Sequence, residues 1–193
     1  MIFLDFEASG LTGFPIEVGI CGVDGDRGRW KASWLIRHDE WLGDLPRWDA
    51  QAEDIHHITR AELIKLGESP RSVMTWLNGE LAGLVACVDS MHDHYWLKEL
   101  AQAAGIVPLF KLESFEVAFA GREIFQVADE ASVQKICLRT HRAADDAEFL
   151  AMRYLLSLYP GAPIHRLFLT PDGQIERLPL HAGCEGEDYH DKA

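Results

Sequence analysis

The start of the chain alternates apolar and polar positions with a period of two. In the first eleven residues, MIFLDFEASGL, the even-numbered positions from 2 to 8 are apolar, whereas Phe3, Asp5 and Glu7 share the opposite face of the expected strand. Two ionised carboxylates at this spacing repel each other by roughly 1–4 kcal/mol. The pattern therefore favours a cation between Asp5 and Glu7. Because an isolated D-x-E is also common at solvated strand ends, the rest of the chain has to supply further ligands.

The next third of the chain is predicted as two strands followed by short helices. Residues 16–23 and 29–36 alternate in the manner of strands and complete a three-stranded meander. Residues 37–48 are polar and contain a proline, so we expect a loop there. Helical spacing then predicts short helices at residues 49–55 and 59–66.

The middle of the chain alternates helices and strands. Ser69 and Pro70 predict a helix that begins at this pair, because a serine N-cap and a proline in the first helical position are typical of helix starts. The apolar run at residues 84–88 is typical of a strand buried on both faces. Residues 92–104 predict an amphipathic helix that ends at Gly105.

The last third is predicted as two further helices, one more strand and a terminal hairpin. The strands are expected at residues 109–115, 167–170 and 175–180, and the helices at residues 117–127 and 145–159.

This order of elements predicts an α/β fold, with a mixed five-stranded sheet and helices on both faces. The first three strands can pair through hairpins, whereas the fourth needs a crossover, so the first strand becomes central. Its carboxylates then lie near the carboxyl edge of the sheet, where open α/β sheets keep their sites. We expect residues 1–160 to form the main domain, and residues 161–193 to add a β-hairpin and an acidic tail to it.

Composition excludes several classes of function. The 193 residues are 48% hydrophobic and 25% charged, as expected for about one soluble domain. A net charge of -13 argues against a broad phosphate-binding surface, but is compatible with a nuclease that holds a few nucleotides through metal ions. The four cysteines form no C-x-x-C pair, and no stretch approaches 18 apolar residues. We therefore expect a cytoplasmic protein without a membrane segment, a zinc knuckle or a disulfide framework.

Further acidic and imidazole groups occur at positions that the fold can bring close to Asp5 and Glu7 on the first strand. Asp93 opens the predicted helix after the buried strand, where a helix N-terminus stabilises a carboxylate. Asp89, at the end of that strand, is the alternative. His141 and Asp146 lie five residues apart, which is about 140° of rotation on one helix. The two side chains can converge only if His141 precedes the helix and Asp146 lies in its first turns.

Taken in order, these residues resemble the DEDDh branch of the 3'-to-5' exonucleases, which includes the polymerase proofreading subunit, ribonuclease T and oligoribonuclease. The resemblance covers residues 1–159 and rests on five positions and five segments: Asp5, Glu7, Asp93, His141, Asp146, DFEASGL, PIEVGI, IHHIT, DHYWLKEL and HRAADDA. This chain departs from the family at His57, where glycine is usual, in the V-D-S approach to Asp93, and in the hairpin after Pro160.

The resemblance implies a ribonuclease H-like fold and hydrolysis with two Mg2+ ions, for which Mn2+ can substitute. Asp5 would bridge the ions, with Glu7 and Asp146 at one ion and Asp93 at the other. His141 would accept a proton from metal-bound water, since histidine exchanges protons near neutral pH. The expected reaction releases nucleoside 5'-monophosphates from the 3' ends of single-stranded RNA or DNA, or of short oligonucleotides.

The resemblance also implies substrate contacts and an assembly. Ala8, Ser9 and Gly10 would offer backbone groups to the terminal nucleotide, and Leu11 would wedge against its base, although Leu11 also suits an apolar core. His56 would line the same cleft, or be an ordinary histidine at a helix end. Homodimers are common in this family, so a homodimer is an expectation for this chain as well. Two other hypotheses are a non-catalytic metal- and nucleic-acid-binding module of the same fold and a nucleotide phosphatase.

Overall fold

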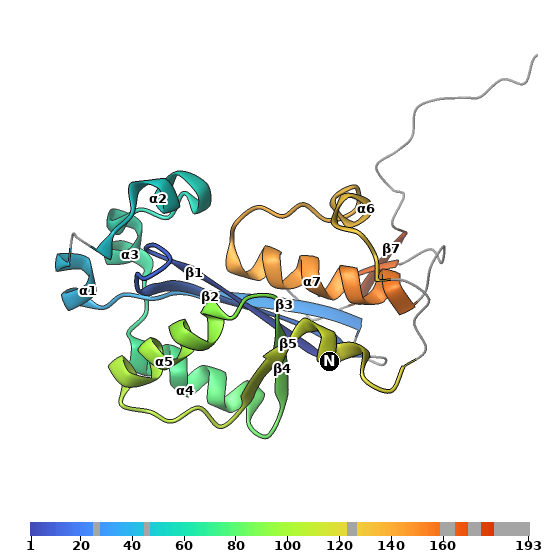
Figure 1. Cartoon of the computed structure of the whole chain (residues 1–193), viewed down its shortest axis with the longest axis horizontal. Coiled ribbons are helices and arrows are strands. Elements are labelled where there is room, and N and C mark those ends of the chain that lie inside the picture. The colour runs from blue at the N-terminus through green and yellow to red at the C-terminus, as the bar shows by residue number, and fades with distance from the viewer. Residues whose placement is uncertain (25–27, 45–46, 123–126, 159–164, 170–174, 180–193) are drawn as a thin grey trace, which may run out of the picture.

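The chain folds around a five-stranded mixed sheet in a computed structural model that describes residues 1–24, 28–44, 47–122, 127–158, 165–169 and 175–179 (Figure 1). The strands run in the order β3-β2-β1-β4-β5. Their bounds are β1 (Ile2–Ala8), β2 (Pro15–Asp24), β3 (Gly28–Leu35), β4 (Val85–Val88) and β5 (Lys111–Ser114). β1 pairs antiparallel with β2 and parallel with β4, so the prediction of a central first strand is confirmed.

Helices cover both faces of this sheet. The described helices are α1 (Asp39–Gly43), α2 (Ala50–His56), α3 (Arg60–Leu66), α4 (Pro70–Leu81), α5 (His92–Ala104), the 3-10 helix η2 (Phe115–Phe119), α6 (Glu130–Gln134) and α7 (Ala143–Leu158). Figure 1 shows α4 and α5 on one side of the sheet and α7 on the other. The hydroxyl of Ser69 accepts a hydrogen bond from the amide of Ser72, which caps α4 as its sequence predicts.

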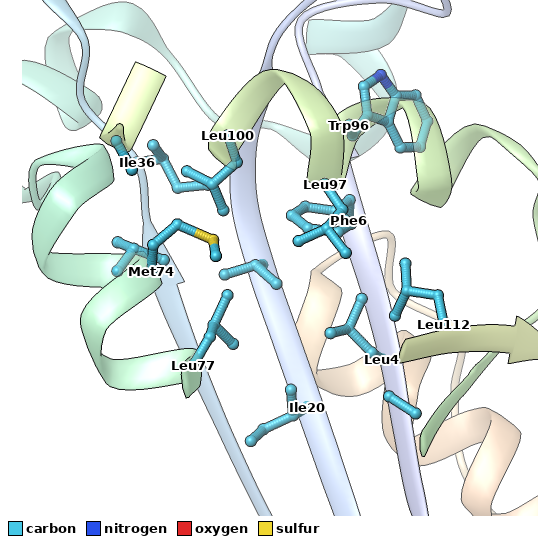
Figure 2. Close-up of a cluster of buried hydrophobic side chains, with 14 of the residues drawn as sticks. Leu4, Phe6, Ile20, Ile36, Met74, Leu77, Trp96, Leu97, Leu100 and Leu112 are labelled. Carbon is cyan, nitrogen blue, oxygen red and sulfur yellow. The ribbon is translucent and has the colours of Figure 1, made fainter. Parts of the chain in front are cut away.

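The alternation of β1 separates two hydrophobic cores. Leu4 and Phe6 point toward α4 and α5, where they pack with residues such as Leu77 and Leu100 (Figure 2). Phe3 points the other way and packs against buried side chains of α7. Because residues 5 and 7 share the face of Phe3, both carboxylates are directed to the α7 side of the sheet.

Two predictions in the connecting segments are wrong. Residues 39–43, expected in a loop, form α1, whose first-turn acids suit the helix dipole and whose Trp41 stacks on Phe14 at 5.0 Å between ring centroids. The helix expected at 117–127 is instead η2, which closes before Gly121 at a φ of 71°. Phe115 and Phe119 of this turn pack on Phe3 and Tyr154, respectively. Residues 123–126 of the predicted helix lie outside the described residues.

The C-terminal segment contributes a separate two-stranded sheet, in which β6 (His165–Leu169) pairs antiparallel with β7 (Ile175–Pro179). The turn expected between these strands and the expected acidic tail at 185–193 lie outside the described residues. The division of the chain at residue 160 stays a prediction. Within the described ranges, no helix has the length and apolar character needed to cross a bilayer.

Candidate active site

The carboxyl end of β1 meets the first turns of two helices, α5 and α7. Asp93 lies in the first turn of α5, and Asp146 lies in the first turn of α7. Two groups result, in each of which the ligand atoms lie within 4.8 Å of one another. The first group contains Asp5, Asp89 and Asp93, and the second contains Glu7, His141 and Asp146. All five residues predicted to carry the chemistry therefore converge on one edge of the sheet.

Asp89 joins the site in addition to Asp93, although the sequence presented the two as alternatives. β4 runs parallel to β1, so the residue that follows β4 arrives at the same edge as Asp5. The signal was present in the sequence, because Asp89 directly follows the buried strand. The end of β4 and the first turn of α5 approach each other closely enough for both carboxylates to reach Asp5.

Burial makes this group of acids hard to ionise. Burial and the Asp89 carboxylate raise the pKa of Asp93 to about 8, and burial followed by Asp146 and Glu17 raises the pKa of Glu7 to about 8. The pKa of Asp5 is also raised well above its usual value, first by burial and then by Asp93 and Glu7. Among the described residues, neither carboxylate oxygen of Asp93 has a hydrogen-bond partner. An oxygen-rich, charge-crowded site with such an orphaned carboxyl fits a hard divalent cation.

These raised pKa values predict a pH-dependent stability for the protein without divalent ions. An unfolded chain ionises its carboxyls near pH 4, whereas Glu7 and Asp93 hold their protons up to about pH 8 when folded. The folded state therefore binds more protons across this window, and the free energy of unfolding contributed by these groups falls as the pH rises. Urea unfolding in EDTA between pH 5 and pH 9 measures the fall. Glu7→Gln should make the fall smaller, and a slope unchanged by that substitution would contradict the assignment.

His141 precedes α7, and Asp146 fixes the loop that carries it. As the spacing predicted, His141 lies outside the helix, at a left-handed φ of 56°, and Asp146 lies in the first turn. The amides of Thr140 and His141 both donate to Oδ1 of Asp146 at 3.2 Å. The His141 side chain is 50% exposed, and its Nδ1 lies 3.9 Å from Oδ2 of Asp146. Its imidazole is thus held beside the acids and remains open to solvent.

A buried glutamate on β2 positions the start of α7. The Glu17 carboxylate accepts hydrogen bonds from Nε and a terminal nitrogen of Arg142, at 3.0 and 2.9 Å. It also accepts the amide of Ala143 at 3.0 Å, at the first residue of the helix. Glu17 is 1% exposed. Glu17 is not among the site residues predicted from the sequence, although a lone acid within the apolar run IEVGI is a usable signal.

The residues predicted to contact substrate differ in the solvent exposure of their side chains. Leu11 is 69% exposed, which suits a contact with a ligand better than a place in the core. Ala8 is buried, and Gly10 adopts a φ of 153°, which glycine tolerates well. The Ser9 hydroxyl is used inside the protein, where it donates to the Arg47 carbonyl and accepts from the Phe14 amide.

His56 and His57 occupy the end of α2. His56 is 2% exposed, and its Nδ1 accepts the amide of Ile58 at 2.9 Å, so the ring helps to hold the backbone. A contact between His56 and substrate stays a prediction. His57 caps the helix at a left-handed φ of 58°. This conformation gives a physical reason for the glycine that is usual at this position.

Comparison with known proteins places the fold. No protein-family model matches the sequence, and no curated protein matches it either. Solved structures do match: exonuclease X in complex with 5' overhanging duplex DNA has 16% identity and a TM-score of 0.52, with 84% of this chain and 94% of that chain covered. E. coli exonuclease I in complex with a dA16 oligonucleotide has 14% identity and a TM-score of 0.59, with 82% and 41% covered.

This chain shares its α/β fold with part of exonuclease I. The zinc-bound form of the E. coli exonuclease I complex with single-stranded DNA also matches, with 14% identity, a TM-score of 0.57, and 80% of this chain and 39% of that chain covered. The chain thus spans about two fifths of exonuclease I, but nearly all of exonuclease X. The predicted α/β architecture is confirmed, since the described residues form a mixed five-stranded sheet with helices on both faces and match this fold.

Proposed function

We propose that this chain is a metal-dependent 3'-to-5' exonuclease that hydrolyses phosphodiester bonds in single-stranded or short nucleic acid. The observation that carries the proposal is the convergence of five carboxylates and His141 on the carboxyl edge of the sheet, with the buried Asp93 carboxyl unpartnered among the described residues. The matched folds support it, because the solved exonuclease X and exonuclease I structures are complexes with DNA.

The two acidic groups would divide the metal ions between them. Asp5, Asp89 and Asp93 can hold one ion, and Glu7 and Asp146 can hold the other. When bound, two Mg2+ or Mn2+ ions supply positive charge to the phosphodiester and lower the pKa of a bound water. The zinc-bound form of an exonuclease I complex is an example of a divalent ion bound by a protein that contains this fold, which supports the proposal.

His141 is the residue we assign to proton transfer. Its half-exposed imidazole lies beside Glu7 and Asp146, and the Asp146 carboxylate fixes its backbone. A water that attacks the phosphorus has to lose a proton, and the imidazole is placed to accept it. Leu11 and the backbone at residues 8–10 are assigned to the terminal nucleotide, because Leu11 is exposed close in sequence to Glu7.

Replacing His141 by alanine tests this role. We expect His141→Ala to lower the rate by roughly 10²- to 10⁴-fold while the affinity for Mn2+ stays nearly unchanged. Single-turnover hydrolysis gives the rate, and isothermal titration with Mn2+ gives the affinity. His94→Ala, a histidine substitution on α5, is the matched control. If His141→Ala instead loses its metal ions, His141 is a ligand or a structural residue and the proton acceptor lies elsewhere.

The reaction itself is tested with matched 5'-labelled single-stranded DNA and RNA, incubated with Mg2+ or with EDTA. We expect a Mg2+-dependent ladder that shortens from the 3' end and releases nucleoside 5'-monophosphates. The DNA-bound structural relatives make single-stranded DNA the first substrate to test. Release of inorganic phosphate from mononucleotides without shortening would favour the phosphatase hypothesis. Metal and oligonucleotide binding without any hydrolysis would favour the non-catalytic module.

A further inference from the structure

Arg139 lies between the two acidic groups of the candidate site and contacts one member of each. Its Nε donates to Oδ2 of Asp146 at 3.0 Å, and a terminal nitrogen donates to Oδ2 of Asp89 at 3.2 Å. The side chain is 28% exposed, whereas the Asp146 side chain is 3% exposed. The planar guanidinium thus connects the end of β4 with the first turn of α7 through the acids themselves.

The charge of Arg139 is strongly coupled to these acids. Burial alone would lower the pKa of Arg139, but Asp89, Asp146 and Asp5 together raise it above its usual value. In return, the guanidinium lowers the pKa of both Glu7 and Asp93, against the larger effect of burial. Arg139 therefore carries a full positive charge and offsets part of the repulsion within the group.

Arg139 uses the carboxylate oxygen that a metal ion would need. Oδ1 of Asp146 already accepts the amides of Thr140 and His141, so Oδ2, which accepts Nε of Arg139, is the oxygen left for an ion. A divalent ion on this oxygen would lie close to the guanidinium, and the two positive charges would repel each other. Unlike the two backbone amides, an arginine side chain can move away by changing its rotamers.

We propose that Arg139 is an internal counter-cation, which neutralises the two acidic groups of the metal-free protein and releases Asp146 and Asp89 when metal ions bind. This inference rests on the proposed function, because it requires the acids to be metal ligands. It has two consequences. Arg139 stabilises the metal-free fold, and it weakens the affinity for divalent ions, since part of the binding free energy is spent on displacing it.

Titration of the intact protein with Mn2+ tests both consequences without measuring hydrolysis. We expect Arg139→Gln to bind Mn2+ about tenfold more tightly than the unsubstituted protein, within the range usual for coupling between sites. We also expect a lower melting temperature in EDTA, with a larger rise on saturation with Mn2+. Arg153→Gln is the matched control, because Arg153 is on α7 but pairs with the Ala128 carbonyl and Glu130. It should leave the Mn2+ affinity unchanged.

Arg139→Lys keeps the test decisive if Arg139→Gln fails to fold. Lysine retains the charge but lacks the fork that reaches both Asp146 and Asp89, so its Mn2+ affinity should lie between those of the other two proteins. The proposal that Arg139 is a counter-cation is wrong if Arg139→Gln binds Mn2+ no more tightly than the unsubstituted protein. If Arg139→Gln does not fold, the same criterion applies to Arg139→Lys. If the unsubstituted protein binds no Mn2+, or if Asp5→Asn does not weaken its binding, the proposed function fails as well. The two failures are thus distinguishable.

Discussion

Asp5→Asn should abolish hydrolysis of single-stranded nucleic acid and at the same time stabilise the metal-free protein. Asp5 is 6% exposed, and burial raises the pKa of its carboxyl. The carboxylates of Asp93, Glu7, Asp146 and Asp89 raise this pKa further, so ionisation of Asp5 is unfavourable. Asparagine keeps the shape but removes the charge that the metal ions need. A pair of like charges 4 Å apart in a protein-like medium repels by about 4 kcal/mol, part of which protonation already relieves. We therefore expect a gain in unfolding free energy of about 1–3 kcal/mol.

Two measurements on the same variant check this prediction. Urea unfolding in EDTA at pH 8 gives the stability, and the labelled-oligonucleotide assay gives the activity. Asp145→Asn is the matched control, because Asp145 lies beside Asp146 but points to Lys31 and Thr140. Full activity in Asp5→Asn would remove Asp5 from the reaction. A loss of stability in EDTA would show that Asp5 makes favourable contacts that outweigh its repulsion.

Gly19→Ala should cost stability and activity together. An added Cβ at Gly19 would lie 2.1 Å from the backbone carbon of Ala143 and from the backbone nitrogen of Ala144. These are backbone atoms at the first turn of α7, so no side-chain rotamer change relieves the overlap. We expect a loss of about 3 kcal/mol or more in unfolding free energy. Since the same turn carries Asp146 and follows His141, hydrolysis should fall as well.

Gly79→Ala is the control for this substitution. Gly79 lies within α4, and a Cβ added there meets nothing within 4 Å. Alanine should therefore stabilise that helix by about 1 kcal/mol. Thermal unfolding of both variants, combined with Mn2+ titration, separates a displaced α7 from a general loss of stability. A Gly19→Ala protein with unchanged stability would mean that α7 approaches β2 less closely than the structure shows.

The parts of this site that sequence could predict follow short-range rules. The two-residue period of β1 placed Asp5 and Glu7 on one face, and the five-residue separation of His141 and Asp146 required a loop before the helix. The roles of Arg139 and Glu17 depend instead on contacts between residues that are far apart in the sequence, so they were not predicted. Their partners lie on other elements of the fold, so no periodicity connects Glu17 with Arg142 or Arg139 with Asp89.

The failed predictions of secondary structure have a similar cause. Tertiary packing decides short elements, since a single turn of helix gains little from propensity alone. Trp41 of α1 stacks on Phe14, and the two ends of η2 pack on other elements, Phe115 on Phe3 and Phe119 on Tyr154. By contrast, α5 and α7 are long and strongly patterned, and both were predicted to within two residues.

The central position of β1 has a consequence for how the protein is made. Synthesis on the ribosome delivers β1 well before its parallel neighbour β4 and its covering helix α7. Until then, Asp5 and Glu7 have no fixed neighbours from those elements, and long-range pairings of this kind form slowly. The candidate site is therefore assembled only after α7 has been made, so a nascent chain that lacks α7 also lacks the elements that fix Asp5 and Glu7.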